Sequence, residues 1–362
     1  MPVVKNFYTI ISLALALIVG LLAGCSSPTG AGNPAGTITL ATPTPSYSLQ
    51  YFSNWPGTGT STGFAPAAST FNGPTTAIVA TSSLAFPNYT FAAWNTKVNS
   101  NGISYYPGAT FPVTTDNSLY AVWLAKSSYS VDANGVLMSF TASSTVVTLP
   151  PGVTSVSTVF QGNTNITSIS IPNGVMAIDS YAFKGCTNLS TVHIPSSVSS
   201  IGSQAFHNCI NLTQVNLPEG LSVIPNNLFM YCNNLSSITL PQSVITIGTL
   251  AFACCSISSV IIPPNVTTIN AMAFNSCQNL TSIVIPAKVT SIGSGTFGTC
   301  PKLENVYVLS TIPATLQTDG VSFSFSGNAQ LLIHVPTIAL ASYKSTWVTQ
   351  TSGLTAAQIV SP

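Results

Sequence analysis

The sequence has very little charge. It contains no arginine, and the charged residues make up only 4% of its 362 residues. Without its first 24 residues the chain would carry six lysines against six acidic residues. A chain this close to neutrality lacks the basic surface that captures nucleic acid or acidic polymers. We therefore expect no nucleic-acid partner.

The residue sets that carry catalysis or bind metals are also missing from the sequence pattern. The three histidines are His193, His207 and His334, and the first two occupy different positions of adjacent repeats. No short Cys-x-x-Cys pair of the kind used by zinc sites is present. Catalytic sets can assemble from distant positions, so sequence alone does not exclude one. We expect no enzyme, no cofactor and no metal.

What the sequence does contain is a repeat. Three residue types recur together at intervals of 22 or 23 residues: Pro172, Pro195, Pro218, Pro241, Pro263 and Pro286; Phe183, Phe206, Phe229, Phe252, Phe274 and Phe297; Cys186, Cys209, Cys232, Cys255, Cys277 and Cys300. Three columns stepping in register indicate one supersecondary unit copied many times. Each copy must bury its apolar face on its neighbours, which is the arrangement of a solenoid.

One repeat, residues 189–209, shows the pattern best. Apolar residues alternate with polar ones up to Pro195, which predicts a short strand with one buried face that the proline ends. Stacked copies place like strands about 4.8 Å apart in a parallel sheet. The opposite wall of the interior is expected to be filled by Val198, Ile201, Ala205, Phe206 and Cys209. The predicted fold is mainly β, a solenoid with one parallel strand per repeat.

One repeat is a residue shorter than the others. The missing residue falls between Cys255 and Pro263, in the turn before the strand. A deletion there slips no side chain to the wrong face, so Ile257, Val260 and Ile262 should stay buried.

The pattern Leu-x-x-Val-x-Ile-Pro-x-x-Val-x-x-Ile-Gly-x-x-Ala-Phe-x-x-Cys in residues 189–209 resembles the repeats of the BspA-like bacterial surface proteins. Residues 333–336 and 342–347 resemble the closing segment of that family. The resemblance implies that residues 153–312 form a leucine-rich-repeat array and that residues 313–362 form a C-terminal cap. The resemblance implies a cell-surface interaction protein, often discussed as an adhesin.

The N-terminus has the features of an export signal. Lys5 precedes an apolar run from Phe7 to Leu22, which is short for a membrane span and placed as in a signal peptide. The run ends Leu-Ala-Gly-Cys at Cys25, which resembles the bacterial lipobox. The resemblance implies a lipoprotein signal peptide over residues 1–24, lipidation of Cys25, and a membrane anchor in the cell envelope, at the outer membrane or cell surface. An ordinary signal peptide with a chance cysteine, or a membrane anchor, is the alternative.

Two segments separate the anchor from the array. Residues 25–45 are rich in Pro, Gly, Thr and Ala and predict a flexible tether. Residues 46–126 carry alternating aromatic residues and predict a small β domain with an aromatic core. This stretch resembles the Listeria–Bacteroides (internalin B-type) repeat, a β-grasp-like module. Residues 127–152 predict a hairpin that caps the first open edge of the solenoid.

The repeat cysteines and the repeat asparagines are both expected to have structural roles. The six repeat cysteines fit a buried, narrow corner, and their parallel Cβ vectors are poor geometry for disulfides. Cys254 stands outside that column and is the best candidate for an exposed thiol. The repeats also begin Asn-x-Ser/Thr triplets at Asn188, Asn211, Asn234 and Asn279, and we expect these asparagines to bond the loop backbone.

The candidate ligand face is the side of the predicted strands that points away from the core. Its members are Thr191, His193, Gln214, Asn216, Ser237, Thr239, Ile261, Val284 and Tyr307, with Ser259, Ser282 and Asn305 beside them. The column passes from polar to partly apolar towards Tyr307, which favours a binding patch at that end. The simpler alternative is a solvated sheet that binds nothing.

Three functions remain open at this stage. The leading hypothesis is a lipid-anchored binding protein or adhesin whose solenoid recognises a protein or glycan on a host or neighbouring cell. The second is a structural envelope component or spacer that presents the N-terminal module. In the third, the module is the binder and the repeats only present it.

Overall fold

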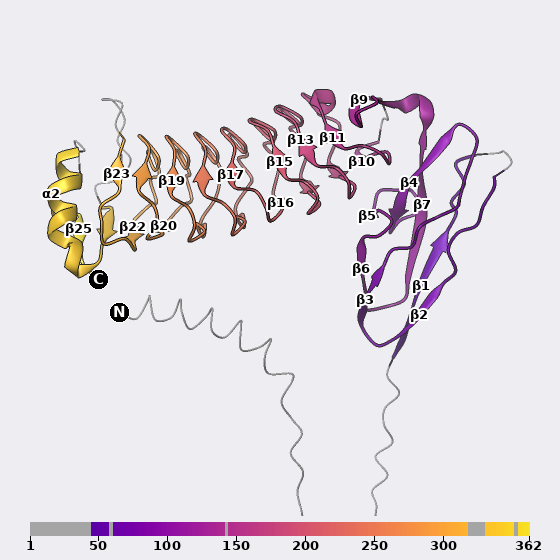
Figure 1. Cartoon of the computed structure of the whole chain (residues 1–362), viewed down its shortest axis with the longest axis horizontal. Helices are drawn as coiled ribbons and strands as arrows, with labels where there is room; N and C mark the ends of the chain where they lie inside the picture. The colour runs from indigo at the N-terminus through magenta and orange to yellow at the C-terminus, as the bar shows by residue number, and fades with distance from the viewer. Residues whose placement is uncertain (1–44, 58–60, 142–143, 318–329, 351–353) are drawn as a thin grey trace, which may run out of the picture. The chain divides into compact units, whose positions relative to one another are not determined.

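The computed structural model describes residues 45–57, 61–141, 144–317, 330–350 and 354–362 (Figure 1). The predicted signal peptide, Cys25 and residues 25–44 of the predicted tether lie outside the described residues. Among the described residues, no helix combines the length and the apolar character that crossing a bilayer requires.

Residues 46–125 form a β unit with an aromatic core. Its main sheet has the order β2-β1-β7-β4-β5, with a separate β3-β6 pair, and β1 and β7 are parallel neighbours. The strands are β1 (Ser46–Phe52), β2 (Ser69–Asn72), β3 (Thr75–Ile78), β4 (Tyr89–Asn95), β5 (Ser104–Tyr105), β6 (Thr110–Val113) and β7 (Asn117–Ala125). Trp94 is fully buried, meets Tyr51 and Phe91 edge-on at 4.9 and 5.0 Å, and donates its indole N–H to the Ala80 carbonyl. The internalin B-type assignment of this unit stays a prediction.

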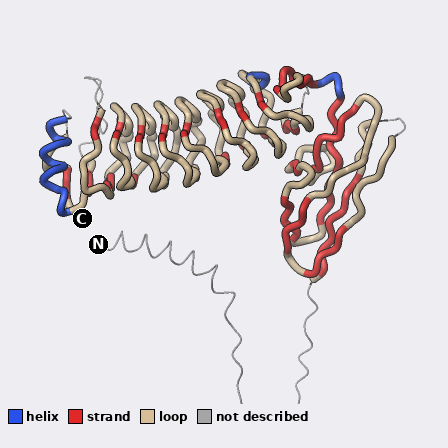
Figure 2. The backbone as a smooth tube through the Cα atoms, in the orientation of Figure 1, coloured by secondary structure: helices blue, strands red, loops and turns tan. Residues whose placement is uncertain are grey.

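The repeats place their short strands on two walls. The first sheet contains β10 (Val146–Thr148), β12 (Ser168–Ser170), β14 (Thr191–His193) and β16 (Gln214–Asn216), then, after a gap, β20 (Ser282–Ile285), β22 (Asn305–Val308), β24 (Leu332–His334) and β25 (Ile359–Val360). The second contains β8 (Tyr129–Val131), β9 (Val136–Phe140), β11 (Ser155–Val156), β13 (Ala177–Ile178) and β15 (Ser200–Ile201), then β17 (Val223–Ile224), β18 (Thr246–Ile247), β19 (Thr268–Ile269), β21 (Ser291–Ile292) and β23 (Thr315–Leu316). The predicted mainly-β solenoid of parallel strands is confirmed, and the structure adds a second, two-residue strand to most repeats. Figure 2 shows that loops and turns make up the rest of each repeat.

The phenylalanine column forms a third wall. Phe160, Phe183, Phe206, Phe229, Phe252, Phe274 and Phe297 are each at most 1% exposed. Successive rings stack at centroid distances of 5.3 to 5.8 Å with interplanar angles of 20° or less. The backbone follows the same ladder, because each phenylalanine N–H from Phe183 to Phe274 donates to the carbonyl of the residue that precedes the next phenylalanine. This wall therefore joins all the central repeats.

The cysteine column lies against the phenylalanine wall. All six cysteines are free and at most 3% exposed, which confirms the predicted buried corner. The sequence did not reveal that each thiol is also a donor. Every Sγ lies 2.9 to 3.4 Å from the carbonyl oxygen of a phenylalanine in the preceding repeat. The thiol hydrogen bond therefore satisfies a buried backbone acceptor as well as filling space.

Each turn around the phenylalanine needs residues with left-handed backbone. In the best-preserved repeat these are Gln204 and Asn208, with φ of 60° and 58°. The repeat position that Cys254 occupies has left-handed backbone in six successive repeats, at Gly185, Asn208, Tyr231, Cys254, Ser276 and Thr299. Gly and Asn at two of these positions are residues that tolerate this conformation, whereas Tyr231 and Thr299 adopt it at a cost.

The asparagines that begin the Asn-x-Ser/Thr triplets only partly follow the prediction. The Asn188 amide donates to the Thr164 backbone carbonyl at 2.7 Å, as expected. Asn211 and Asn234 instead donate to the side-chain oxygen of the preceding asparagine, at 3.4 and 3.0 Å. The prediction of backbone bonding is wrong for these two, because stacking brings equivalent side chains of adjacent repeats within hydrogen-bond distance.

Both ends of the solenoid are covered by non-repeat structure. Antiparallel β8 and β9 precede the array, with β9 pairing in parallel with β11, and short helical turns η1 (Lys126–Ser128) and η2 (Thr158–Phe160) flank them. At the other end η3 (Thr337–Ala339) leads into helix α2 (Leu340–Gln350). Tyr343 and Trp347 on α2 are fully buried, and they donate to the carbonyls of Ser310 and Ala314 at 3.0 and 2.8 Å.

The N-terminal unit is bonded to the start of the first sheet. The Tyr106 hydroxyl accepts the Leu149 N–H at 3.0 Å and donates to the Ser170 carbonyl at 2.8 Å. The Ser104 and Thr148 hydroxyls lie 2.9 Å apart and are both buried. Burial raises the pKa of Tyr106, so its hydroxyl stays protonated. These contacts fix the segment after β4 to the first repeat strands.

Candidate ligand-binding face

Two rows of side chains cover the outer side of the first sheet, and we call this surface the first face. Pairing in β12, β14 and β16 sets Ser168 beside Thr191 and Gln214, and Ser170 beside His193 and Asn216. Alternation along each strand turns the residues between them into the core. The full rows are Ser168, Thr191, Gln214, Ser237, Ser259, Ser282 and Asn305, and Ser170, His193, Asn216, Thr239, Ile261, Val284 and Tyr307.

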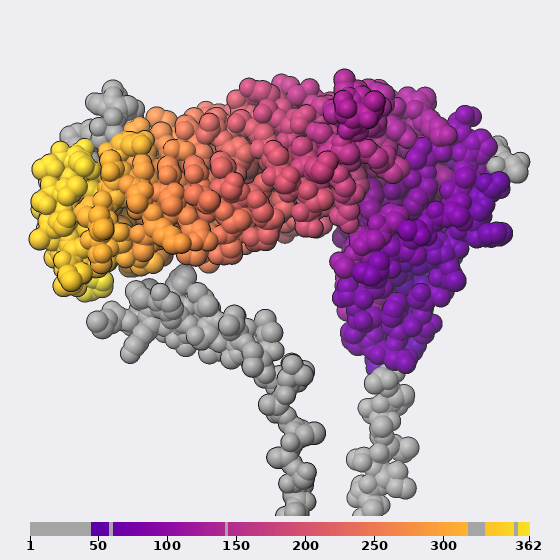
Figure 3. All heavy atoms as spheres, viewed as in Figure 1, coloured from indigo at the N-terminus to yellow at the C-terminus, as the bar shows by residue number. Residues whose placement is uncertain are grey.

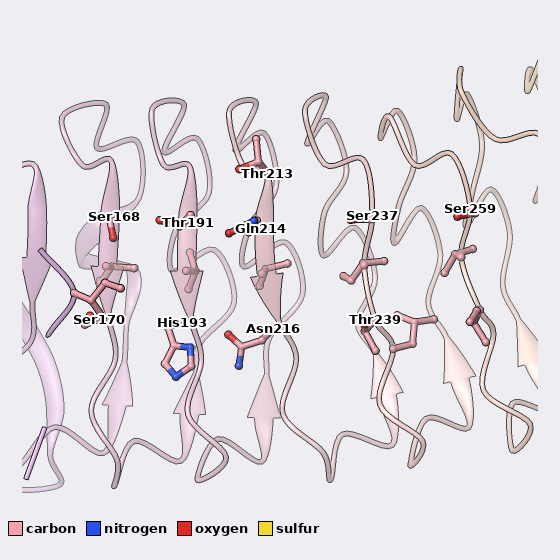
Figure 4. Close-up of a pocket in the computed structure, with 18 of the residues that line it drawn as sticks. Ser168, Ser170, Thr191, His193, Thr213, Gln214, Asn216, Ser237, Thr239 and Ser259 are labelled. Atoms are coloured by element: carbon pink, nitrogen blue, oxygen red, sulfur yellow. The ribbon is translucent and has the colours of Figure 1, made fainter. Parts of the chain in front are cut away.

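A groove of about 810 Å³ lies on the N-terminal part of the first face. It runs from Ser168 to Ile261, and Gly102 and Ile103 of the N-terminal unit border it. Figure 4 shows the side chains of this stretch in successive repeats, with those of Thr191, Gln214 and Ser237 following one another along it. Figure 3 shows the repeats packed against one another along the whole array.

Most of the polar side chains in the groove have no hydrogen-bond partner among the described residues. In the described part of the chain, the side chains of Thr191, Gln214, Ser237 and Thr239 make no hydrogen bond. Asn216 differs, because its amide donates to the Ile194 carbonyl at 2.7 Å and its oxygen accepts the Ile194 N–H at 3.1 Å. Asn216 therefore has a structural role that its place in the pattern did not indicate.

The C-terminal part of the first face lies outside the groove. Val284 and Tyr307 are half-buried, and the His334 ring stacks on Tyr307 at 4.5 Å. The His334 Nε2 atom also lies 2.9 Å from Asn305 Oδ1, and burial lowers the pKa of this histidine. The sequence favoured a patch at the Tyr307 end. The groove instead lies at the polar end, with Ile261, 68% exposed, at its margin.

The first sheet is interrupted within the groove. Neither a strand pairing nor a backbone hydrogen bond joins β16 to residues 237–240 in the described part of the chain, and only an isolated bridge, Ile261 to Val284, precedes β20. The predicted burial of Ile257, Val260 and Ile262 is confirmed, but their segment is not a strand. The interruption brackets the shortened repeat.

The second sheet is interrupted between β15 and β17, one repeat before the interruption of the first sheet. The sequence shows why the pairing is lost there. In other repeats the residue after the second-sheet isoleucine donates to the preceding strand, as Gly202 does to Ile178 and Gly248 to Ile224, both at 2.8 Å. The equivalent residue here is Pro225, which has no N–H. This proline was the signal that could have revealed the break.

The remaining histidines and Cys254 lie at different places in the described part of the chain. Among the described residues no group of three or more His, Cys, Asp or Glu is placed to hold a metal. His193 lies on the first face, whereas the Nδ1 atom of His207 is buried without a partner and burial lowers its pKa. Cys254, the predicted exposed thiol, is half-buried, and burial raises its pKa above that of a free thiol.

Comparison with known proteins addresses the repeats directly. Residues 156–281 and 205–329 match the BspA type leucine rich repeat region, in six copies. The repeats belong to the BspA-type leucine-rich-repeat family. No curated protein matches the chain.

Several solved structures resemble the BspA-type array. A leucine-rich repeat protein from Bacteroides ovatus is 24% identical with a TM-score of 0.41, and the match covers 59% of this chain and 54% of that one. The chain thus spans about half the length of that relative. A leucine rich cell surface protein from Faecalibacterium prausnitzii is 23% identical, with coverage of 57% and 73% and a TM-score of 0.39. The leucine-rich repeat protein of T. pallidum is 24% identical, with coverage of 60% and 91% and a TM-score of 0.38.

Proposed function

We propose that the chain is a non-catalytic binding protein of the bacterial cell surface that acts as an adhesin through its first face. The observation that supports this most is the groove, whose polar side chains at Thr191, Gln214, Ser237 and Thr239 have no hydrogen-bond partner in the part of the chain that the structure describes. Ordered polar groups that face solvent in a shaped hollow suit recognition of a ligand. The partner is a protein or glycan on a host or neighbouring cell.

The N-terminal sequence supports surface location. The apolar run before Cys25 and the Leu-Ala-Gly-Cys motif fit export followed by lipidation. Several acyl chains on Cys25 hold a protein on a membrane more firmly than one chain does. The lipid anchor, the tether and the N-terminal unit would then present the array away from the membrane.

Three lysines placed in the groove test this function. We expect the triple variant Gln214→Lys, Ser237→Lys and Thr239→Lys to abolish attachment of displaying bacteria to other cells and to immobilised matrix protein and glycan. Long charged side chains fill the hollow and remove its hydrogen-bonding groups. The measurement is the attached fraction, with surface display quantified by antibody.

The matched control adds the same charge to the other wall. Ser200, Val223 and Thr246 lie on the second sheet, outside the groove, and their replacement by lysine should leave attachment unchanged. Full attachment by the groove variant would contradict the adhesin proposal. If a deletion strain then showed altered envelope integrity but normal attachment, the chain would be a structural spacer.

A further inference from the structure

The interruption of the first sheet exposes backbone as well as side chains. Residues 214–216 and 237–240 follow one another in the stack, yet no backbone hydrogen bond joins them in the described part of the chain. We call this place the split. The inward-facing strand residues are less buried at the split. Val215 is half-buried and Ile238 is 9% exposed, whereas the equivalent residues Ile169 and Val306 in the paired parts are 1% and 0% exposed.

The third wall continues unbroken behind the split. Phe206 and Phe229 stack at 5.6 Å, and the Phe206 N–H donates to the Leu228 carbonyl at 3.1 Å. The third wall is therefore continuous across the repeats whose two sheets are broken. In the described part of the chain, the backbone N–H and C=O groups on the side of β16 that faces residues 237–240 therefore have no backbone partner there, and such groups need a partner.

The groove matches a ligand without charge. Among its lining residues there is no lysine, aspartate or glutamate. Glu219, which accepts the N–H of the lining residue Gln242 at 2.9 Å, is not one of them. The hydroxyl and amide groups of Gln214, Ser237 and Thr239 are each able to donate and to accept hydrogen bonds. Sugar hydroxyls have the same dual capacity, so the two sets of groups are complementary.

A folded protein partner fits the groove less well. Protein interfaces concentrate their binding energy in buried Trp, Tyr and Arg side chains. The lining residues contain none of these three, and His193 is their only aromatic ring. The exposed apolar groups in the lining are the aliphatic side chains of Ile103 and Ile261, and Val215 is half-buried. Aliphatic groups of this size suit the C–H faces of sugar rings.

We propose that the groove binds a neutral, linear glycan that runs along the solenoid and completes the hydrogen bonds of the split. Equivalent positions recur about every 4.8 Å along the stack, so a regular polymer meets similar groups in successive repeats. The glycan spans Thr191 to Ser259, with its central residues over Ser237 and Thr239. This inference rests on the proposed function and specifies the ligand class for the same face.

The test uses the purified full-length chain and defined soluble probes. These are linear hexasaccharides of glucose, mannose and N-acetylglucosamine, an acidic oligogalacturonate, and a neutral Ser/Thr/Gly peptide of similar length. We expect saturable calorimetric binding of at least one neutral hexasaccharide, with a Kd that changes less than about twofold between low and high salt. Hydrogen exchange at the amides of residues 237–240 should slow when it binds.

Removal of two hydroxyls locates the site. The double variant Ser237→Ala and Thr239→Val removes both hydroxyls without adding bulk and should weaken binding about tenfold. The control double variant Thr246→Val and Thr268→Val makes a comparable change on the second sheet and should bind as the wild type does. Far-ultraviolet circular dichroism and thermal unfolding of both variants verify that they fold.

Three results would overturn the inference: no neutral hexasaccharide binds saturably, the oligogalacturonate or the peptide binds instead, or the groove variant binds as tightly as the control. None of these decides the proposed function, which the attachment assay with the lysine variant tests separately. Loss of attachment in that assay, together with failure of every glycan probe, would leave the face as the adhesin site with a ligand of another class.

Discussion

Replacing Phe229 by alanine should lower the free energy of unfolding by about 3–5 kcal/mol. Phe229 is fully buried and stacks on Phe206 at 5.6 Å and on Phe252 at 5.7 Å. Alanine removes both ring contacts and leaves a cavity in the one wall that continues across the broken sheets. Because each repeat contacts only its neighbours, the loss should also uncouple the repeats on either side.

Guanidinium unfolding followed by tryptophan fluorescence measures this effect. Trp94 reports on the N-terminal unit and Trp347 on the C-terminal helix, so uncoupling should separate one transition into two. Phe64→Ala is the control, because Phe64 is 85% exposed and its removal should cost little. A Phe229→Ala chain that unfolds at the wild-type midpoint would contradict the role given to the phenylalanine wall.

The chain should lose stability steeply above about pH 9 under reducing conditions. Burial raises the pKa of Cys186 and of Cys232 to about 12, against 9.0 for a free thiol. A raised folded-state pKa means that the folded chain holds the proton more tightly than the unfolded chain does. The stabilisation is complete below pH 9 and is lost as the pH rises towards 12, which amounts to about 2–3 kcal/mol per thiol at about pH 11.

A single substitution isolates the thiol contribution from that of the tyrosines. Cys232→Ala should be less stable than the wild type at neutral pH, because it loses the bond to the Phe206 carbonyl and some packing. The difference in the free energy of unfolding between the two proteins should shrink as the pH rises, because only the wild type has a thiol at position 232 that ionises more easily in the unfolded chain than in the folded one. A constant difference between pH 8 and 11 would show that burial does not hold the proton on Cys232.

Much of the solenoid could be predicted because its signals repeat. The phenylalanine and cysteine columns recur in six copies, so their burial follows from period alone. The second-sheet strands are two residues long, as at Ser200–Ile201, and too short to show alternation. The left-handed turns carry Gly185 and Asn208 in two copies, but other residue types hide the column elsewhere.

The candidate site was harder to predict because it depends on departures from the repeat. The residues of the first face follow from strand alternation, and the structure brings Thr191, Gln214, Ser237 and Thr239 together in the groove. The location of the groove depends on the missing pairing between β16 and residues 237–240. No single residue of β16 predicts this loss of pairing. Burial of Tyr307 by His334 joins residues 27 positions apart and lies outside the regular period. Pro225 was a local signal only for the break in the second sheet, between β15 and β17.

Protease treatment of intact cells tests whether the array is displayed outside the cell, as a surface adhesin requires. Bacteria expressing the full chain are exposed to protease and blotted for the repeat region, with a periplasmic protein as the control for cell integrity. If the array is displayed on the surface, the repeat signal is lost while the periplasmic control stays intact. Full protection of the array, with digestion only after lysis, would contradict surface display and with it the adhesin function.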